Sequence, residues 1–163
     1  MPEEKATTGP VIVVGVDGSP AGTAALRWAV EQATREHGRV RAVSVRYAPE
    51  LMPATSFALQ PHGTRAPEQD PAQHLTWLHA LIAAATAGVD GAAPVEALSL
   101  VGDPEAELTR AAADADLLVV GGHGQGPLAE VFLGSVAAGS VRHAECPVVV
   151  IPAAMARRLT TAG

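Results

Sequence analysis

The feature that most constrains the fold is an apolar, largely β-branched run near the start of the chain, followed at once by a turn and a helix signal. Residues 11–16 read Val-Ile-Val-Val-Gly-Val, which is typical of a parallel strand buried on both faces. The turn that follows ends in Ser19, a good helix N-cap, and Pro20, which suits the first helical position. This strand and helix predict the beginning of a βαβ unit.

The same alternation continues along the chain. Further apolar runs predict strands over residues 40–47, 95–101, 117–120 and 148–151. Helical spacing predicts helices over residues 20–38, 72–87, 106–115 and 136–143. Alternating strands and helices predict an α/β fold with one open parallel sheet, helices on both faces and right-handed crossovers.

The length of the chain predicts one domain. With 163 residues it is the size of a single ordinary domain. We expect this domain to cover residues 11–152, with a long surface loop over residues 48–71 that is rich in proline and polar residues. The ends, residues 1–10 and 153–163, are expected to be a flexible leader and a flexible tail.

Composition limits the partners. The formal net charge is −6, so no basic field attracts nucleic acid or an anionic membrane surface. No apolar run approaches the roughly 20 residues that span a bilayer, and acidic residues stand where a signal peptide needs a basic region. The single cysteine, Cys146, fits a reducing compartment. The sequence predicts a cytoplasmic protein with no nucleic-acid partner and no membrane partner.

A glycine-rich segment follows the strand expected at residues 117–120. It begins at Gly121 and, after a short apolar stretch, Gly134-Ser135 opens the next helix. Glycines let backbone N–H groups approach a phosphate, and a helix N-terminus adds unpaired donors with partial positive charge. Because the only lysine, Lys5, lies in the expected leader, an anion site here must be built from the backbone.

Asp17 follows the first expected strand directly. Ligands on open α/β sheets bind beyond the carboxyl ends of the strands, where the winding direction reverses. There a carboxylate can accept hydrogen bonds from a ribose hydroxyl or an exocyclic amine. Taken alone, however, Asp17 is more simply explained as a turn residue that helps to cap the first helix, and a lone glycine cluster as a turn without a ligand.

The spacing of the glycines favours a ligand. Gly121, two residues, Gly124, nine residues and then Gly134-Ser135 resembles the nucleotide-binding pattern of the universal stress protein family, in its ATP-binding branch. Residues 14–19 and 146–150 resemble segments of the same family near its first and last strands. The resemblance implies a Rossmann-like, five-stranded parallel sheet of order 3-2-1-4-5, in which Asp17 faces the glycine loop.

The resemblance also implies a ligand, an assembly and a set of binding residues. The ligand is ATP, AMP or cyclic AMP, and the assembly is a homodimer through Val148–Ile151. The loop departs from the family because it lacks the basic residue often found there, so Mg²⁺ would balance the phosphate charge. Gly15 and Asp17 would lie against the nucleoside and Val45 against the adenine. The ribose and phosphates would be held by Gly121, His123, Gly124, Gly134, Ser135 and Val136.

Other classes of site fit less well. The first strand is not followed by the glycine pattern of dinucleotide-binding proteins, the P-loop lysine is missing, and no nucleophile elbow occurs. His74 and His79 lie five apart, and His143 and Cys146 supply only two ligands, so we expect no metal site built from protein side chains.

Three functions stay open from the sequence. The first is a regulatory stress-response protein that binds an adenine nucleotide. The second is a dimeric stress scaffold in which the glycine loop holds no nucleotide. The third is a weak ATPase. We expect slow hydrolysis at most, because no cation or general base is convincingly placed for phosphoryl transfer.

Overall fold

The computed structural model describes residues 8–47, 70–122 and 133–161. Its five strands are β1 (Val11–Gly15), β2 (Arg39–Arg46), β3 (Val95–Val101), β4 (Leu117–Gly121) and β5 (Val148–Ile151). Its helices are α1 (Pro20–Arg35), α2 (Pro71–Thr86), α3 (Pro104–Ala111), α4 (Ser135–His143) and α5 (Ala153–Thr161). Every pairing in the sheet is parallel and the strand order is β3-β2-β1-β4-β5. The predicted fold class and the sheet order implied by the family resemblance are therefore confirmed.

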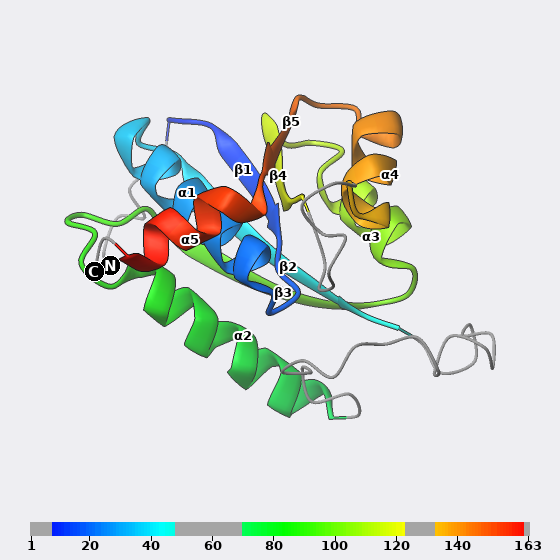
Figure 1. The fold of residues 1–163 in the computed structure, drawn as a ribbon, viewed down its shortest axis with the longest axis horizontal. Helices are drawn as coiled ribbons and strands as arrows, with labels where there is room; N and C mark the ends of the chain where they lie inside the picture. Colours follow the sequence, from blue (N-terminus) through cyan, green and yellow to red (C-terminus); the bar gives the residue numbers. More distant parts are fainter. Residues whose placement is uncertain (1–7, 48–69, 123–132, 162–163) are drawn as a thin grey trace.

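The helices cover both faces of the sheet. α1 packs against α2 and α5 on one face, and α3 packs against α4 on the other. Figure 1 shows these two groups of helices with the strands between them. The chain changes face between β3 and β4, so the helices that leave the neighbouring strands β1 and β4 lie on opposite faces.

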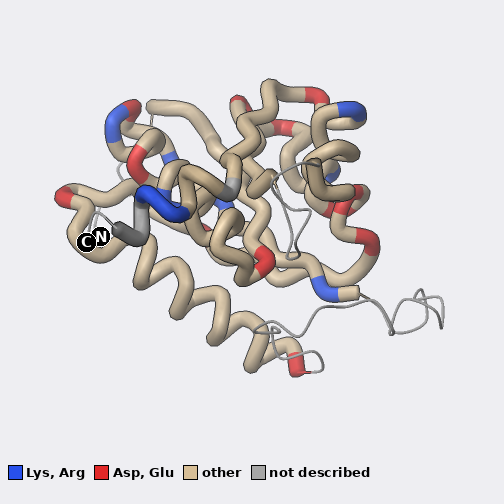
Figure 2. Tube along the Cα trace, in the orientation of Figure 1, with Lys and Arg blue, Asp and Glu red and all other residues tan. Residues whose placement is uncertain are grey.

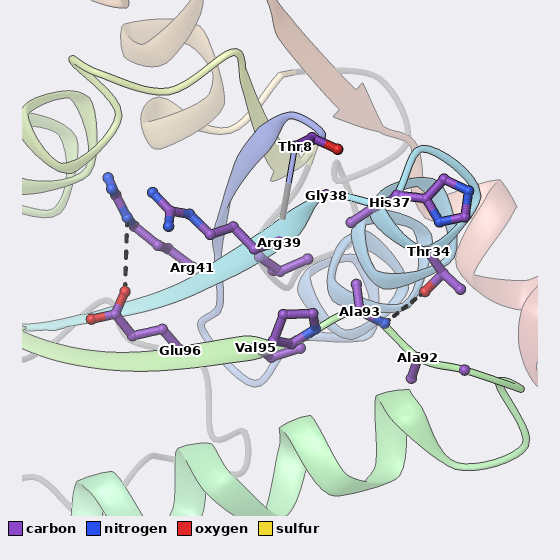
Figure 3. A pocket seen from close by; sticks show the side chains of 14 residues that line it. Thr8, Thr34, His37, Gly38, Arg39, Arg41, Ala92, Ala93, Val95 and Glu96 are labelled. Atoms are coloured by element: carbon purple, nitrogen blue, oxygen red, sulfur yellow. Dashed lines mark hydrogen bonds and ion pairs between the residues drawn. The ribbon is translucent and has the colours of Figure 1, made fainter. Parts of the chain in front are cut away.

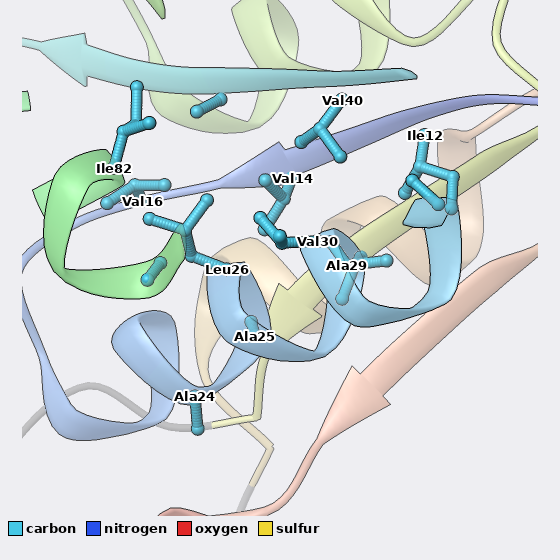
Figure 4. Close-up of a cluster of buried hydrophobic side chains, with 14 of the residues drawn as sticks. Ile12, Val14, Val16, Ala24, Ala25, Leu26, Ala29, Val30, Val40 and Ile82 are labelled. Carbon is cyan, nitrogen blue, oxygen red and sulfur yellow. The ribbon is translucent and has the colours of Figure 1, made fainter. Parts of the chain in front are cut away.

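The larger core lies between the sheet and α1. Ile12, Val14 and Val16 alternate along the first strand and pack toward the helix, where Leu26 and Val30 are fully buried. Figure 4 shows these side chains together with several alanines of the same helix. The alanines allow α1 to approach the sheet closely, and burying one side chain of the size of Leu26 contributes about 1.5–3 kcal/mol.

A smaller core lies on the opposite face. Val13, Val43 and Val120 point from the sheet toward Leu108 of α3 and Ala137 of α4, and all five are buried. Because these contacts fix α3 and α4 against the sheet, they also fix the positions of the residues at the starts of both helices.

Side chains cap the first three helices. Ser19 Oγ accepts a hydrogen bond from Gly22 N at 3.0 Å, and Asp103 Oδ2 accepts one from Ala106 N at 2.9 Å, as their positions before Pro20 and Pro104 predict. Asp70 caps α2 in the same way. α4 differs, because its N-cap residue is a glycine that provides no side-chain acceptor.

Residues 153–161 were expected to be part of a flexible tail, and this expectation is wrong. They form α5, which packs on α1 and buries Ala156. The cause is tertiary packing, because a short segment without a cap signal becomes a helix where another helix covers its apolar side.

The other expected flexible segments are only partly described. In the leader, Gly9 N donates to His37 O at 3.2 Å and Pro10 O accepts from Arg39 N at 3.0 Å. Most of the expected loop over residues 48–71 lies outside the described residues, and its last two residues are the cap and first residue of α2.

α2 carries no charged residue between its ends, and Figure 2 shows it without acidic or basic colour beyond its capping aspartate. In the described part of the chain, no helix is both long enough and apolar enough to cross a membrane.

Candidate functional site

The candidate site is a cleft at the carboxyl ends of β1 and β4. These strands are neighbours, and their following helices leave on opposite faces, which is the switch point where open α/β sheets bind ligands. The cleft has a volume of about 280 Å³. Its walls come from the ends of three strands and from the first turns of α1, α3 and α4.

The structure brings most of the predicted site residues together. Seven of the nine line this cleft: Gly15, Asp17, Val45, Gly121, Gly134, Ser135 and Val136. The other two, His123 and Gly124, lie outside the described residues. Segments that are far apart in the sequence therefore meet at one place, because β4 lies beside β1 and not beside β3.

Asp17 has the turn role that its sequence context predicted, and it also lines the cleft. Its Oδ1 atom accepts hydrogen bonds from Ser19 N at 2.9 Å and Ser19 Oγ at 2.6 Å. These bonds hold the exposed carboxylate at the end of the first strand. Both hydrogen bonds that the described residues donate to this carboxylate end on Oδ1. Its Oδ2 atom can therefore accept a hydrogen bond from a ligand.

Two glycines allow the elements around the cleft to approach closely. A Cβ atom on Gly121 would lie 2.8 Å from the backbone of Ala21 and of Gly22, so the first turn of α1 rests directly on the end of β4. A Cβ atom on Gly15 would lie 2.9 Å from Leu108 Cδ2. Both glycines therefore set the width of the cleft.

The N-terminus of α4 presents backbone N–H groups that have no partner inside the helix. Gly134, its N-cap, offers no side-chain acceptor, and its own N–H donates to Gly122 O at 2.7 Å. The first turn of a helix has N–H groups with no partner inside the helix and carries partial positive charge. With the Ser135 hydroxyl beside them in the cleft, these groups can bind an anion such as a phosphate.

A side-chain hydrogen bond links α4 to α3. His143 Nδ1 lies 2.6 Å from Glu105 Oε1, at the opposite end of α4 from Ser135. The pair links the two helices that form one wall of the cleft.

Besides Val45, which was predicted, residues of α3 and the residue after β2 form a wall that the sequence did not indicate. Tyr47, Pro104 and Leu108 all line the cleft. Burial and the nearby carboxylate of Asp103 raise the pKa of Tyr47 above its usual value. The helix start at Pro104 follows the end of β3, so the carboxyl-end rule alone could have drawn attention to it.

A second and larger hollow, of about 1070 Å³, lies at the opposite ends of the strands, and Figure 3 shows its walls. Most of its charged side chains are paired with an opposite charge. Arg41 donates to both carboxylate oxygens of Asp114, at 2.7 and 3.1 Å, and lies 3.8 Å from Glu96. This bond to Arg41 lowers the pKa of Asp114. The position and the paired charges both favour the smaller cleft as the candidate site.

The fold and the cleft define a Rossmann-like α/β protein in which a helix N-terminus without a side-chain cap lies at the switch point of the sheet. The chain belongs to the universal stress protein family, whose sequence profile matches residues 10–152.

Two comparisons illustrate this membership. The chain is 34% identical over 155 residues to the universal stress protein Rv2623 of Mycobacterium tuberculosis, covering 86% of this chain and 46% of that protein. It thus spans about half the length of the curated relatives that it matches. The structure is similar to the universal stress protein UspA of Lactobacillus plantarum, with a TM-score of 0.58, 27% identity and coverage of 87% of this chain and 97% of that one.

A third similar structure is that of a universal stress protein in complex with cAMP. Its TM-score is 0.59 at 26% identity, and the match covers 89% of this chain and 98% of that chain.

Proposed function

We propose that this chain is a regulatory protein that binds an adenine nucleotide in the cleft between the ends of β1 and β4. The observation that carries the proposal is the meeting of an accepting carboxylate, Asp17, with the uncapped N-terminus of α4 in one cleft. The similar universal stress protein in complex with cAMP supports adenine as the base.

The chemistry of the cleft changes from one end to the other. Val45, Leu108 and Val136 give an apolar wall that suits the faces of a base. Asp17 can accept a hydrogen bond from a ribose hydroxyl, and the first turn of α4 with Ser135 can hold phosphate oxygens. The described residues therefore fit a nucleotide without a lysine.

The finer parts of the proposal are ATP as the nucleotide and Mg²⁺ as its companion. The described residues that line the cleft include no lysine or arginine, so Mg²⁺ would balance the phosphates. Rapid phosphoryl transfer needs several positioned cations. We therefore propose that bound ATP acts as a signal of nucleotide level and that its hydrolysis is slow.

A homodimer through Val148–Ile151 is a further part of the proposal. β5 lies at the edge of the sheet and pairs only with β4 among the described strands. Val148, Val149 and Val150 are half-buried in the single chain, so a second copy could cover them. The cytoplasmic location expected from the sequence stays a prediction.

Titration calorimetry tests the proposal once co-purified nucleotide has been removed. We expect saturable binding of ATP with Mg²⁺, also of AMP or cyclic AMP, and weaker binding of GTP. Ser135→Ala should weaken ATP binding several-fold. Ser140→Ala is the matched control, because Ser140 lies on the same helix but is buried outside the cleft. Absence of binding at millimolar ATP would overturn the proposal and favour the scaffold function.

A further inference from the structure

Tyr47 is an aromatic side chain left open at the apolar end of the cleft. Its residue follows β2 directly, and 49% of its surface is exposed. Val43, Val45 and Tyr47 alternate along the chain and all line the cleft, as residues two apart on a strand share one face. The ring therefore extends the apolar wall beyond the end of the strand.

The residues of α3 and α4 that line this part of the cleft are also apolar. Pro104 and Leu108 of α3 line it together with Val136 of α4. The polar groups come from Asp17, just after β1, and from Ser135, the first residue of α4. A nucleotide whose phosphates lie at α4 would direct its base toward the β2 side, where Tyr47 is the one aromatic residue among the described lining residues.

The Tyr47 phenol is also uncharged, which is the form that stacks on a base. Burial and the Asp103 carboxylate raise the pKa of Tyr47, so the ring stays uncharged at neutral pH and above. A neutral aromatic face gains dispersion and apolar contact from a planar base whatever its hydrogen-bonding edge.

We infer that the ring of Tyr47 stacks on the base of the bound nucleotide and makes the cleft prefer purines to pyrimidines. The inference rests on the proposed function, since it assigns the base-selecting residue of the same cleft. Stacking depends on the area of the base, so a purine gains more from the ring than a pyrimidine does.

Two substitutions of Tyr47 and one control separate the ring from its hydroxyl. Tyr47→Ala should weaken ATP binding about tenfold and uridine triphosphate binding less, because base–aromatic stacking is worth on the order of tenfold in affinity. Tyr47→Phe should keep the affinity within about twofold, since it keeps the ring. Val101→Ala is the control: Val101 is 50% exposed at the end of β3 but does not line the cleft.

A direct signal comes from 3-fluorotyrosine, because the chain has a single tyrosine. We expect the one fluorine resonance to shift on addition of ATP and to stay in place with inorganic triphosphate. Unchanged ATP affinity in Tyr47→Ala, or an equal loss of ATP affinity in Tyr47→Phe, would overturn the inference. Either result would leave the proposed function supported as long as the wild type binds ATP. Absence of ATP binding by the wild type would overturn both.

Discussion

Replacing His74 with alanine should remove the main polar link between α2 and the sheet. The imidazole is fully buried, with Nε2 3.1 Å from Ser44 Oγ on β2 and Nδ1 2.5 Å from Ser99 Oγ on β3. Its ring also stacks on Trp77 at a centroid distance of 5.4 Å. A neutral imidazole can donate from one nitrogen and accept at the other, so it satisfies both hydroxyls.

The loss of stability in His74→Ala comes from an unpaired hydroxyl and from a cavity. The Ser44 hydroxyl is buried, and leaving such a group without its partner costs about 1–3 kcal/mol. Truncation of the buried ring adds the loss of apolar contact and a cavity, as for other large buried side chains. Ser99 is partly exposed and can reach water. We expect His74→Ala to lower the free energy of unfolding by about 3–5 kcal/mol.

Urea unfolding followed by circular dichroism measures this difference. His79→Ala is the matched control, because it makes the same change in helix propensity in the same helix at an exposed position. It should change the free energy of unfolding by less than about 0.5 kcal/mol. Equal effects of the two substitutions would refute the role given to the buried network.

The same variant should alter the pH dependence of stability. Burial and the nearby charge of Arg46 lower the pKa of His74. The unfolded chain therefore binds a proton near pH 6.5 that the folded chain still excludes. Stability contributed by the neutral ring is present above about pH 6.5 and is lost as the pH falls toward the lowered folded pKa. His74→Ala should lose this slope, and an unchanged slope would contradict the assignment.

Two further predictions concern the cleft and the thiol. Gly121→Ala should lower the free energy of unfolding by about 1–3 kcal/mol, because its Cβ would meet the backbone of Ala21. Gly15→Ala should lower the free energy of unfolding less, because its Cβ would meet only a terminal methyl of Leu108. Equal costs in urea unfolding would refute this reading of the contacts. Burial raises the pKa of the Cys146 thiol, so its reaction with a disulfide reagent at pH 8 should be slower than that of free cysteine, and an equal rate would contradict this.

The sequence alone predicted the elements of the fold well. The strands over 95–101 and 148–151 have the predicted bounds, because each is a short apolar run between clear turn signals. Helix ends differ by a few residues, as expected where the last turn competes with a cap. The order of the strands came from the family resemblance, since local patterns do not determine which strands are neighbours.

The missed features all depend on contacts between distant segments. Residues 153–161 become a helix only where α1 covers them. Leu108 reaches the cleft because α3 packs against β2 on the second face of the sheet, and Tyr47 reaches it because it directly follows β2. The glycines and Asp17 could be named in advance because their spacing resembles a known family pattern, whereas an apolar wall is made from residues that look like ordinary core.

The location of the bound nucleotide is tested most directly by the amide chemical shifts of the ¹⁵N-labelled protein during titration with ATP and Mg²⁺. We predict that the largest changes will fall on Gly15, Asp17, Gly121 and Ser135, with little change around the larger hollow beside Arg41. Changes centred on that hollow, or none at saturating ATP, would contradict a nucleotide site at the switch point between β1 and β4.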